Sequence, residues 1–186
     1  MAKQSITNFK SNISSIGFAR SNIFEATINP PGTTNAKTSP TNHKFYIKAA
    51  SLPASNIGTI GIPFQGRVFN VPGDRTFDAW STTIINSENL EFRKFLESWV
   101  NDVQDNKVNL SVANGLAYQS TLEIKSFMRD KTAGESLKTA RHYKFHNCFP
   151  TSVSAIDLDF ASNDAIEEFT CEWQYSHWTV EKPTTK

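Results

Sequence analysis

A strict two-residue alternation near the end of the chain is the feature that most limits how it can fold. From position 168 onward, polar residues alternate with large apolar ones. The apolar set is Phe169, Cys171, Trp173 and Tyr175, and the polar set is Glu168, Thr170, Glu172 and Gln174. Because successive side chains of a β-strand point to opposite sides, this pattern predicts a strand with one buried and one solvated face. We expect this strand to span residues 165–179 and to need a second layer on its apolar side.

Other segments of alternating or β-branched character make the chain mainly β. They predict strands at 22–29, 43–50, 64–71, 76–85, 118–129, 136–149 and 152–160. In the strand over 43–50, we expect Phe45, Ile47 and Ala49 to share the buried face. Taken together, these strands favour two packed antiparallel sheets, a β-sandwich or partial barrel, with one flanking α-helix.

The flanking helix is predicted over residues 88–104. Its apolar stripe follows helical spacing and consists of Phe92, Phe95, Leu96, Trp99, Val100 and Val103. Asn86 or Ser87 is expected to cap the helix, and Glu88 and Glu91 lie in its positive first turn.

The segment from Ser51 to Pro63 combines apolar residues with helix and strand breakers. Leu52, Ile57, Ile60 and Ile62 are interleaved there with two prolines and two glycines. This composition indicates an irregular connector, covered either by another copy of the chain or by lying as a strand on its own sheet. We favour the first reading, because exposed apolar surface usually marks a contact. After the strand at 64–71, Pro72 and Gly73 predict a turn.

Length and composition limit the domain organisation and the class of partner. The 186 residues suit one domain over 18–180, with an N-terminal arm at 1–17, a loop at 30–42 and a C-terminal tail at 181–186. The formal charge of +1, from 19 basic and 18 acidic side chains, does not favour gripping DNA. No apolar run or signal core is present, so we expect synthesis in the cytosol and no membrane binding. Cys148 and Cys171 are expected to be buried, reduced thiols.

No motif in the chain predicts catalysis, a cofactor or a metal. His142 and His146 fall on one predicted strand, which holds them about 13 Å apart at about 3.3 Å per residue, too far for one zinc. Residues 141–146 interleave basic and aromatic side chains, but no wider basic field supports nucleic-acid binding. The glycines of 61–66 lack the Lys and Ser/Thr of a phosphate loop. Paired acids such as Asp157 and Asp159 alternate with apolar residues and are expected to be solvated, so we expect no enzyme.

The segment that links these strands to the helix resembles the major tail tube protein family of T4-like contractile-tailed bacteriophages. The similarity rests on the run Pro72–Asp78 and Trp80, followed by Arg93-Lys94-Phe95 and Trp99 in the predicted helix. Weaker similarity extends from about residue 18 to residue 178 and includes Lys48–Ala54 and Asp157–Phe160. The resemblance implies a tail-tube fold and a structural virion protein.

By the same resemblance, the subunits are expected to form hexameric rings whose sheets join into a continuous β-barrel. The rings would stack inside a contractile sheath, and the genome would pass through the lumen during injection. Implied partners are the sheath, baseplate and tail-terminator proteins, with the tape measure protein and viral DNA in the lumen. The expected location is the virion tail, assembled in the host bacterial cytoplasm.

Two surfaces are assigned to this assembly from the residues themselves. The subunit or ring interface is predicted at Leu52, Pro53, Ile57, Ile60, Ile62, Phe64, Pro72, Asp74 and Arg75. The lumen face is predicted at Glu123, Glu168, Thr170, Glu172 and Gln174, because solvated acids repel the phosphate backbone.

Two alternative functions remain open at this point. One is a related tube component, either a tube initiator or the tube of a genome-free contractile injection system. The other is a ligand-binding β-sandwich in which Trp173, Tyr175 and Trp178 line a cleft. Size in solution separates these classes, because a tube protein forms rings or tubes and a ligand-binding domain can remain monomeric.

Overall fold

The computed structural model describes residues 5–6, 8–11, 18–32, 43–108, 110–111, 115–129 and 137–181. The elements in chain order are β1 (Phe24–Ile28), the 3-10 turn η1 (His43–Phe45), β2 (Ile47–Ala50), β3 (Asn56–Phe64), β4 (Arg67–Thr76), β5 (Trp80–Ile85), α2 (Glu91–Val103), β6 (Ser120–Phe127), β7 (Thr139–Val153), β8 (Glu168–Gln174) and β9 (His177–Glu181). Most of the predicted N-terminal arm, residues 33–42 of the predicted loop and residues 182–186 of the tail lie outside the described residues.

Seven of the strands form one antiparallel sheet that folds over on itself. The order is β1-β6-β7-β8-β5-β2, and β9 pairs with β7. The 15-residue strand β7 belongs to both halves, because its first part pairs with β6 and β9 and its last part pairs with β8. The change of partner occurs next to Asn147, which has a positive φ of 56°. We call β1, β6, β9 and the start of β7 the first half-sheet, and β2, β5, β8 and the end of β7 the second half-sheet.

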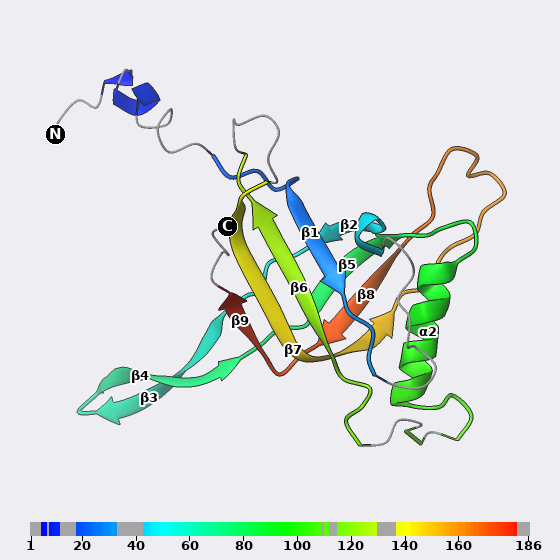
Figure 1. Ribbon diagram of the computed structural model, residues 1–186. Helices are drawn as coiled ribbons and strands as arrows, with labels where there is room; N and C mark the ends of the chain where they lie inside the picture. Colours follow the sequence, from blue (N-terminus) through cyan, green and yellow to red (C-terminus); the bar gives the residue numbers. More distant parts are fainter. Residues whose placement is uncertain are drawn as a thin grey trace.

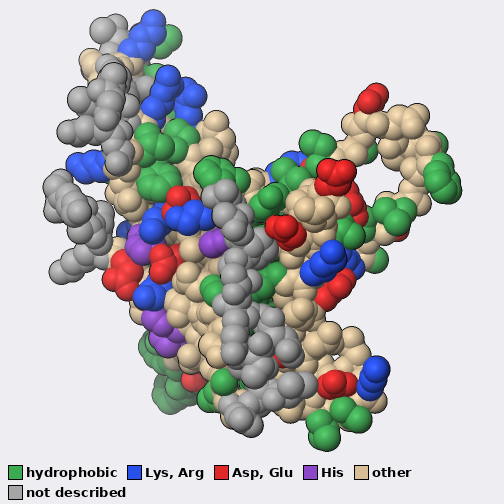
Figure 2. Space-filling model, turned by 45° about the vertical axis from the view of Figure 1, so that its right-hand side comes forward, with side chains coloured by type: hydrophobic (Ala, Val, Ile, Leu, Met, Phe, Trp, Pro, Cys, Tyr) green, Lys and Arg blue, Asp and Glu red, His purple; other side chains and the backbone are tan. Residues whose placement is uncertain are grey.

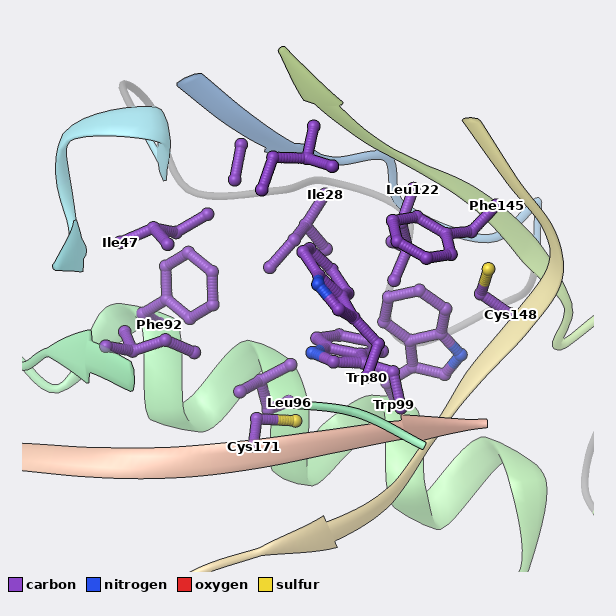
Figure 3. Close-up of a cluster of buried hydrophobic side chains, with 14 of the residues drawn as sticks. Ile28, Ile47, Trp80, Phe92, Leu96, Trp99, Leu122, Phe145, Cys148 and Cys171 are labelled. Atoms are coloured by element: carbon purple, nitrogen blue, oxygen red, sulfur yellow. The ribbon is translucent and has the colours of Figure 1, made fainter. Parts of the chain in front are cut away.

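The two half-sheets face each other across one aromatic core (Figure 3). Trp80 of β5 stacks on Phe145 of β7, with ring centroids 4.7 Å apart and an interplanar angle of 29°. Tyr175 lies 5.0 Å from the same Phe145 ring. The predicted buried face of β8 is confirmed, since Phe169, Cys171 and Trp173 are at most 2% exposed. The two-layer arrangement expected from the alternating strands is therefore present, although one continuous sheet supplies both layers.

Helix α2 lies at one side of the two half-sheets and packs its apolar stripe against the core (Figure 1). Phe92, Leu96 and Trp99 are fully buried, and the Trp99 ring lies 5.3 Å from that of Trp173. The helix begins three residues later than expected, at Glu91, whose backbone N–H donates to the Ser87 Oγ at 3.2 Å. Leu90 takes a left-handed conformation with φ of 54° and so delays the first helical turn.

The irregular connector and the turn at Pro72–Gly73 were wrong predictions. Residues 56–64 and 67–76 instead form β3 and β4, a separate two-stranded hairpin that stands away from the rest of the chain (Figure 1). Its turn is Gln65–Gly66, where both φ angles are positive, at 45° and 77°, as two-residue hairpin loops require. Pro72 pairs with Thr59 inside the strand, and proline is tolerated there because an isolated ribbon has open edges.

A glycine is favoured at position 73 of β4 because the two strands approach each other closely there. The register shifts between Ile57 and Thr59. A Cβ atom added to Gly73 would lie 3.3 Å from the backbone of Gly58. Gly58 and Gly73 therefore allow the two strands to lie close together at a β-bulge, although glycine in the sequence favoured a turn.

Further strand predictions need correction. The strand expected over 64–71 is divided by the Gln65–Gly66 turn, and the strand expected over 76–85 begins only at Trp80, after β4 ends at Thr76. The strand expected over 152–160 does not form, because β7 continues to Val153 and residues 154–167 leave the sheet as a loop. The strand expected over 165–179 is interrupted at Tyr175–Ser176 and becomes β8 and β9. Of the three residues expected on the buried face of 43–50, Ile47 is buried, but Phe45 lies in η1 and is 82% exposed. Ala49 is also exposed, because the pairing of β2 with β5 shifts in register between Ile47 and Ala49. The strands predicted over 22–29 and 118–129 are confirmed as β1 and β6.

Candidate assembly surfaces

The hairpin brings together seven of the nine predicted interface residues. These are Ile57, Ile60, Ile62, Phe64, Pro72, Asp74 and Arg75. The other two, Leu52 and Pro53, lie in the segment that joins β2 to the hairpin. The four large apolar residues of β3 are between 49% and 69% exposed. Every residue of β3 is exposed, so the chain does not bury this strand by itself.

One face of the hairpin is almost entirely apolar. Cross-strand pairing joins Ile60 to Val71, Ile62 to Phe69 and Phe64 to Arg67. Because paired residues and alternate positions share a side of a ribbon, these six side chains form one surface, which we call the hairpin face. The sequence analysis did not assign Phe69 or Val68 to the interface, although they are 67% and 65% exposed. The apolar residues among positions 67–71 could have indicated this exposed surface, but only the pairing of β4 with β3 shows which of them share a side of the hairpin.

The base of the hairpin is attached to the folded core by side-chain hydrogen bonds. The Trp80 Nε1 donates to the Ser51 carbonyl at 2.6 Å, and the Trp178 Nε1 donates to the Ala54 carbonyl at 3.3 Å. The Asn56 side-chain amide donates to the Asp78 carboxylate at 2.6 Å. These bonds hold the starting point of the hairpin while its length remains in solvent. Within the described part of the chain, neither Asp74 nor Arg75 forms an ion pair.

Four of the predicted lumen residues lie together on the outer face of β8. Glu168, Thr170, Glu172 and Gln174 alternate with the buried residues of that strand, and β5 presents Ser81, Thr83 and Ile85 beside them. Lys48 of β2 forms an ion pair with Glu168 at 2.6 Å. This outer face of the second half-sheet is therefore polar, with a carboxylate at Glu172 that has no ion pair among the described residues.

The fifth predicted lumen residue, Glu123, lies elsewhere. It belongs to β6 and to the outer face of the first half-sheet, opposite Thr27 and Lys144 on the neighbouring strands. Its carboxylate lies 3.0 Å from the His142 Nε2 and 3.7 Å from the Lys125 Nζ. The structure does not bring Glu123 together with the β8 residues, because the two half-sheets turn their outer faces away from a shared core.

A histidine pair occupies the same outer face as Glu123. His146 of β7 and His177 of β9 are cross-strand partners, and their rings stack at 4.6 Å with an angle of 12°. The His146 Nε2 lies 2.9 Å from the Thr179 Oγ1. Burial, followed by the proximity of His177 and Lys144, lowers the pKa of His146 below its ordinary value, while Glu181 opposes this shift.

The positions of the aromatic, metal-ligating and thiol side chains bear on the alternative of a ligand-binding site. Trp173 and Tyr175 are 0% and 4% exposed, so the aromatic cleft expected for a ligand-binding sandwich is wrong. Within the described residues, no three His, Cys, Asp or Glu side chains gather where they could hold a metal. Cys148 and Cys171 are buried and unpaired, and burial raises the pKa of the Cys148 thiol to about 12. Among the helices described, none has the length and apolar character needed to cross a membrane.

Comparison with known proteins supports the interpretation that these exposed surfaces belong to a protein that assembles with others. The family model for phage tail tube proteins matches residues 15–181. The tail tube protein gp19 of Enterobacteria phage T4 is 27% identical over 161 residues, which cover 87% of this chain and 91% of that protein. The tail tube protein of Serratia phage KSP90 is 25% identical over 161 residues, with 86% of each chain covered.

Solved structures with the same fold come from contractile machines. The tube-terminating cap of the anti-feeding prophage superposes with a TM-score of 0.61 at 17% identity, covering 88% of this chain and 91% of that chain. A chain of the PVC sheath–tube complex from an extracellular contractile injection system gives a TM-score of 0.55 at 18% identity, covering 96% and 99%. Since the family model spans most of the sequence, this chain belongs to the phage tail tube protein family.

Proposed function

We propose that copies of this chain form six-membered rings that stack into the inner tube of a contractile phage tail. The tail tube role follows from family membership. Ring formation and stacking are supported by the hairpin, whose apolar face is not covered by any of the described residues. An isolated two-stranded ribbon is only marginally stable in water, and exposed apolar patches of this kind favour a contact with another protein.

The partners follow from the same role. In the proposed assembly, the tube runs inside a sheath, starts at a baseplate and ends at a terminator, and a related solved structure is named as a sheath–tube complex. The tape measure protein and then the viral DNA would occupy the lumen. The chain would be made and assembled in the host bacterial cytoplasm and would act as a structural component of the virion tail, without catalysis.

The lumen is assigned to the outer face of β8. Glu168, Thr170, Glu172 and Gln174 present polar or acidic side chains on one strand face, and such a surface does not hold a phosphate backbone. Glu123 faces outward from the other half-sheet, so the proposed lumen surface is limited to the four β8 residues.

The experiment that tests this function asks whether assembly depends on the hairpin face. Ile60→Asp is expected to abolish tubes in negative-stain micrographs and to leave a folded monomer in size-exclusion chromatography, because a carboxylate cannot be buried unpaired in an apolar contact. Ile60→Val is the matched control and should assemble normally. If the unaltered protein remains monomeric at high concentration, or if Ile60→Asp forms tubes of normal length, the proposal is wrong.

A further inference from the structure

A second unpartnered apolar surface lies in the loop at residues 154–167, between β7 and β8. Leu158, Phe160 and Ile166 are 85%, 107% and 69% exposed. The loop is tied to the sheet at its two ends, where the Ser154 N–H donates to the Thr170 carbonyl and the Asn86 N–H donates to the Glu167 carbonyl, both at 2.9 Å. Its middle part stands away from the body of the molecule (Figure 2).

The loop surrounds a hollow large enough to receive side chains from another molecule. The hollow has a volume of about 470 Å³ and is lined in part by Ile156, Leu158 and Ile166. Acidic side chains, among them Asp157 and Asp159, line the rest of this hollow, which is open to solvent. A mixed apolar and acidic lining suits an arginine with aromatic neighbours, and arginine and aromatic residues dominate the centres of protein interfaces.

Charge restricts which surface could cover this loop. Residues 154–168 contain Asp157, Asp159, Asp164, Glu167 and Glu168 and no Lys or Arg. The hairpin carries the opposite sign, because Arg67 is the charged residue of 56–73 and lies directly at the Gln65–Gly66 turn. Phe64, which is paired with that arginine, and Phe69, two residues further along β4, lie on the same side of the hairpin and are 69% and 67% exposed. The hairpin tip thus matches the loop in both apolar character and charge.

The position of the two surfaces excludes a contact within one molecule. The hairpin tip and the 154–167 loop lie at opposite ends of the structure (Figure 1). Two complementary surfaces on opposite ends of one subunit join copies head to tail, and such contacts repeat without closing on themselves unless the rotation forms a ring.

We propose that the hairpin tip of one copy docks on the 154–167 loop of the next copy. Phe64 or Phe69 would pack against the exposed side chains of Leu158 and Phe160, and the guanidinium of Arg67 would lie against the carboxylates of Asp157 and Asp159, which line the hollow. This inference rests on the proposed tube function. It adds to that function the surface on which the hairpin docks and the residues that meet there.

Cross-linking in assembled tubes tests the contact directly. The variant Gln65→Cys/Ser162→Cys places one thiol at the hairpin turn and one on the loop, and the native thiols are buried. Treatment of tubes with a short bis-maleimide is expected to give a ladder of covalent dimers, trimers and longer chains on denaturing gels. Each single variant should remain monomeric on the gel. So should the control Gln65→Cys/Glu97→Cys, in which the second thiol lies on the solvent-facing side of helix α2.

Charge reversal gives an independent readout of the same contact. Arg67→Glu should raise the protein concentration needed for tube formation about tenfold or more, since like charges in a contact disfavour association. Asp157→Arg/Asp159→Arg should do the same, and combining the two changes should return the value to within about threefold of the original, as expected when a charge pair is restored in the opposite sense.

The outcomes separate this inference from the tube function. If the unaltered protein forms tubes but the double-cysteine variant, also assembled as tubes, gives no ladder, the docking contact is wrong and the tube role stands. If both charge-reversed proteins assemble as readily as the original, the contact is equally overturned. If the unaltered protein forms no tubes, the proposed function fails first.

Discussion

The pairing of β7 with β9 places His177 beside His146 and thereby helps to lower the pKa of the His146 side chain. The stacked imidazoles lie on adjacent strands, with Lys144 on the same strand face and Glu181 on β9. A positive charge at His146 is unfavourable there, because the site is partly desolvated and lies close to His177 and Lys144. The pair was not visible in the sequence, since it depends on β9 returning beside β7.

This geometry predicts a loss of stability in mild acid. The pKa of His146 is lowered from 6.5, so the unfolded chain binds more protons than the folded chain as the pH falls below that value. The free energy of unfolding should therefore decrease as the pH falls from about 7.5 to about 5.5, because proton binding favours the state that takes up more protons. Urea unfolding of the monomeric Ile60→Asp protein at the two pH values measures this decrease.

The control for this prediction removes the titrating ring. His146→Gln should lose less stability over the same pH interval than the protein that retains the histidine. A slope that is equal in both proteins would show that other groups cause the acid sensitivity.

At the scale of elements, helix α2 is the part whose local sequence and tertiary role agree most closely. Its apolar stripe was predicted from spacing alone, and the structure buries Phe92, Phe95, Leu96 and Trp99 of that stripe, while Val100 and Val103 are half-buried. Trp99 makes both ring contacts and a hydrogen bond at this interface. Its ring lies 5.3 Å from Trp173 and 5.7 Å from Phe95, and its Nε1 donates to the Tyr118 carbonyl at 2.7 Å.

Removal of this ring should be the most damaging single truncation in the helix. Trp99→Ala is expected to reduce the free energy of unfolding by about 3–5 kcal/mol, the range for a large aromatic deleted from a packed core. Lys94→Ala on the exposed side of the helix should change it by less than about 0.5 kcal/mol. Chemical denaturation of both variants in the monomeric background measures the difference, and equal losses would contradict the packing role of Trp99.

At the scale of the whole molecule, two exposed features stand away from a closed aromatic core. The hairpin and the 154–167 loop contain most of the large exposed apolar side chains from residue 56 to residue 181. A chain that buries Trp80, Trp99 and Trp173 completely does not leave such residues in water for lack of a core. Their exposure is explained if neighbouring copies cover them in a tube.

The electrostatics of the assembled tube can be tested through the outer face of β8. Thr170→Lys/Glu172→Lys should leave tube assembly intact, because both side chains are on the polar face of the strand, but should slow DNA ejection through electrostatic attraction to the phosphates. Ejection kinetics of assembled phage, with Glu172→Gln as the matched neutral control, measure the effect. Ejection at the original rate from tails with normal morphology would show that this face does not line the lumen.

The sequence alone determined the features that depend on neighbouring residues. The alternation in 168–175 and the stripe of Phe92 to Trp99 specify which side of a strand or helix is apolar, and burial follows from that choice. The family resemblance was based mainly on the short run Pro72–Asp78, and the comparisons support membership of that family.

Only the tertiary structure decided which of these surfaces meet and which remain open. The hairpin was hidden because Pro72 and Gly73 are turn formers in most contexts. Their place in a bulged strand depends on the pairing of Pro72 with Thr59 and on the close approach of Gly73 to the Gly58 backbone. Glu123 was grouped with the β8 acids by composition, but the fold-over of β7 places it on the other half-sheet. Strand partners are set by contacts between residues far apart in the chain, and local periodicity carries no information about them.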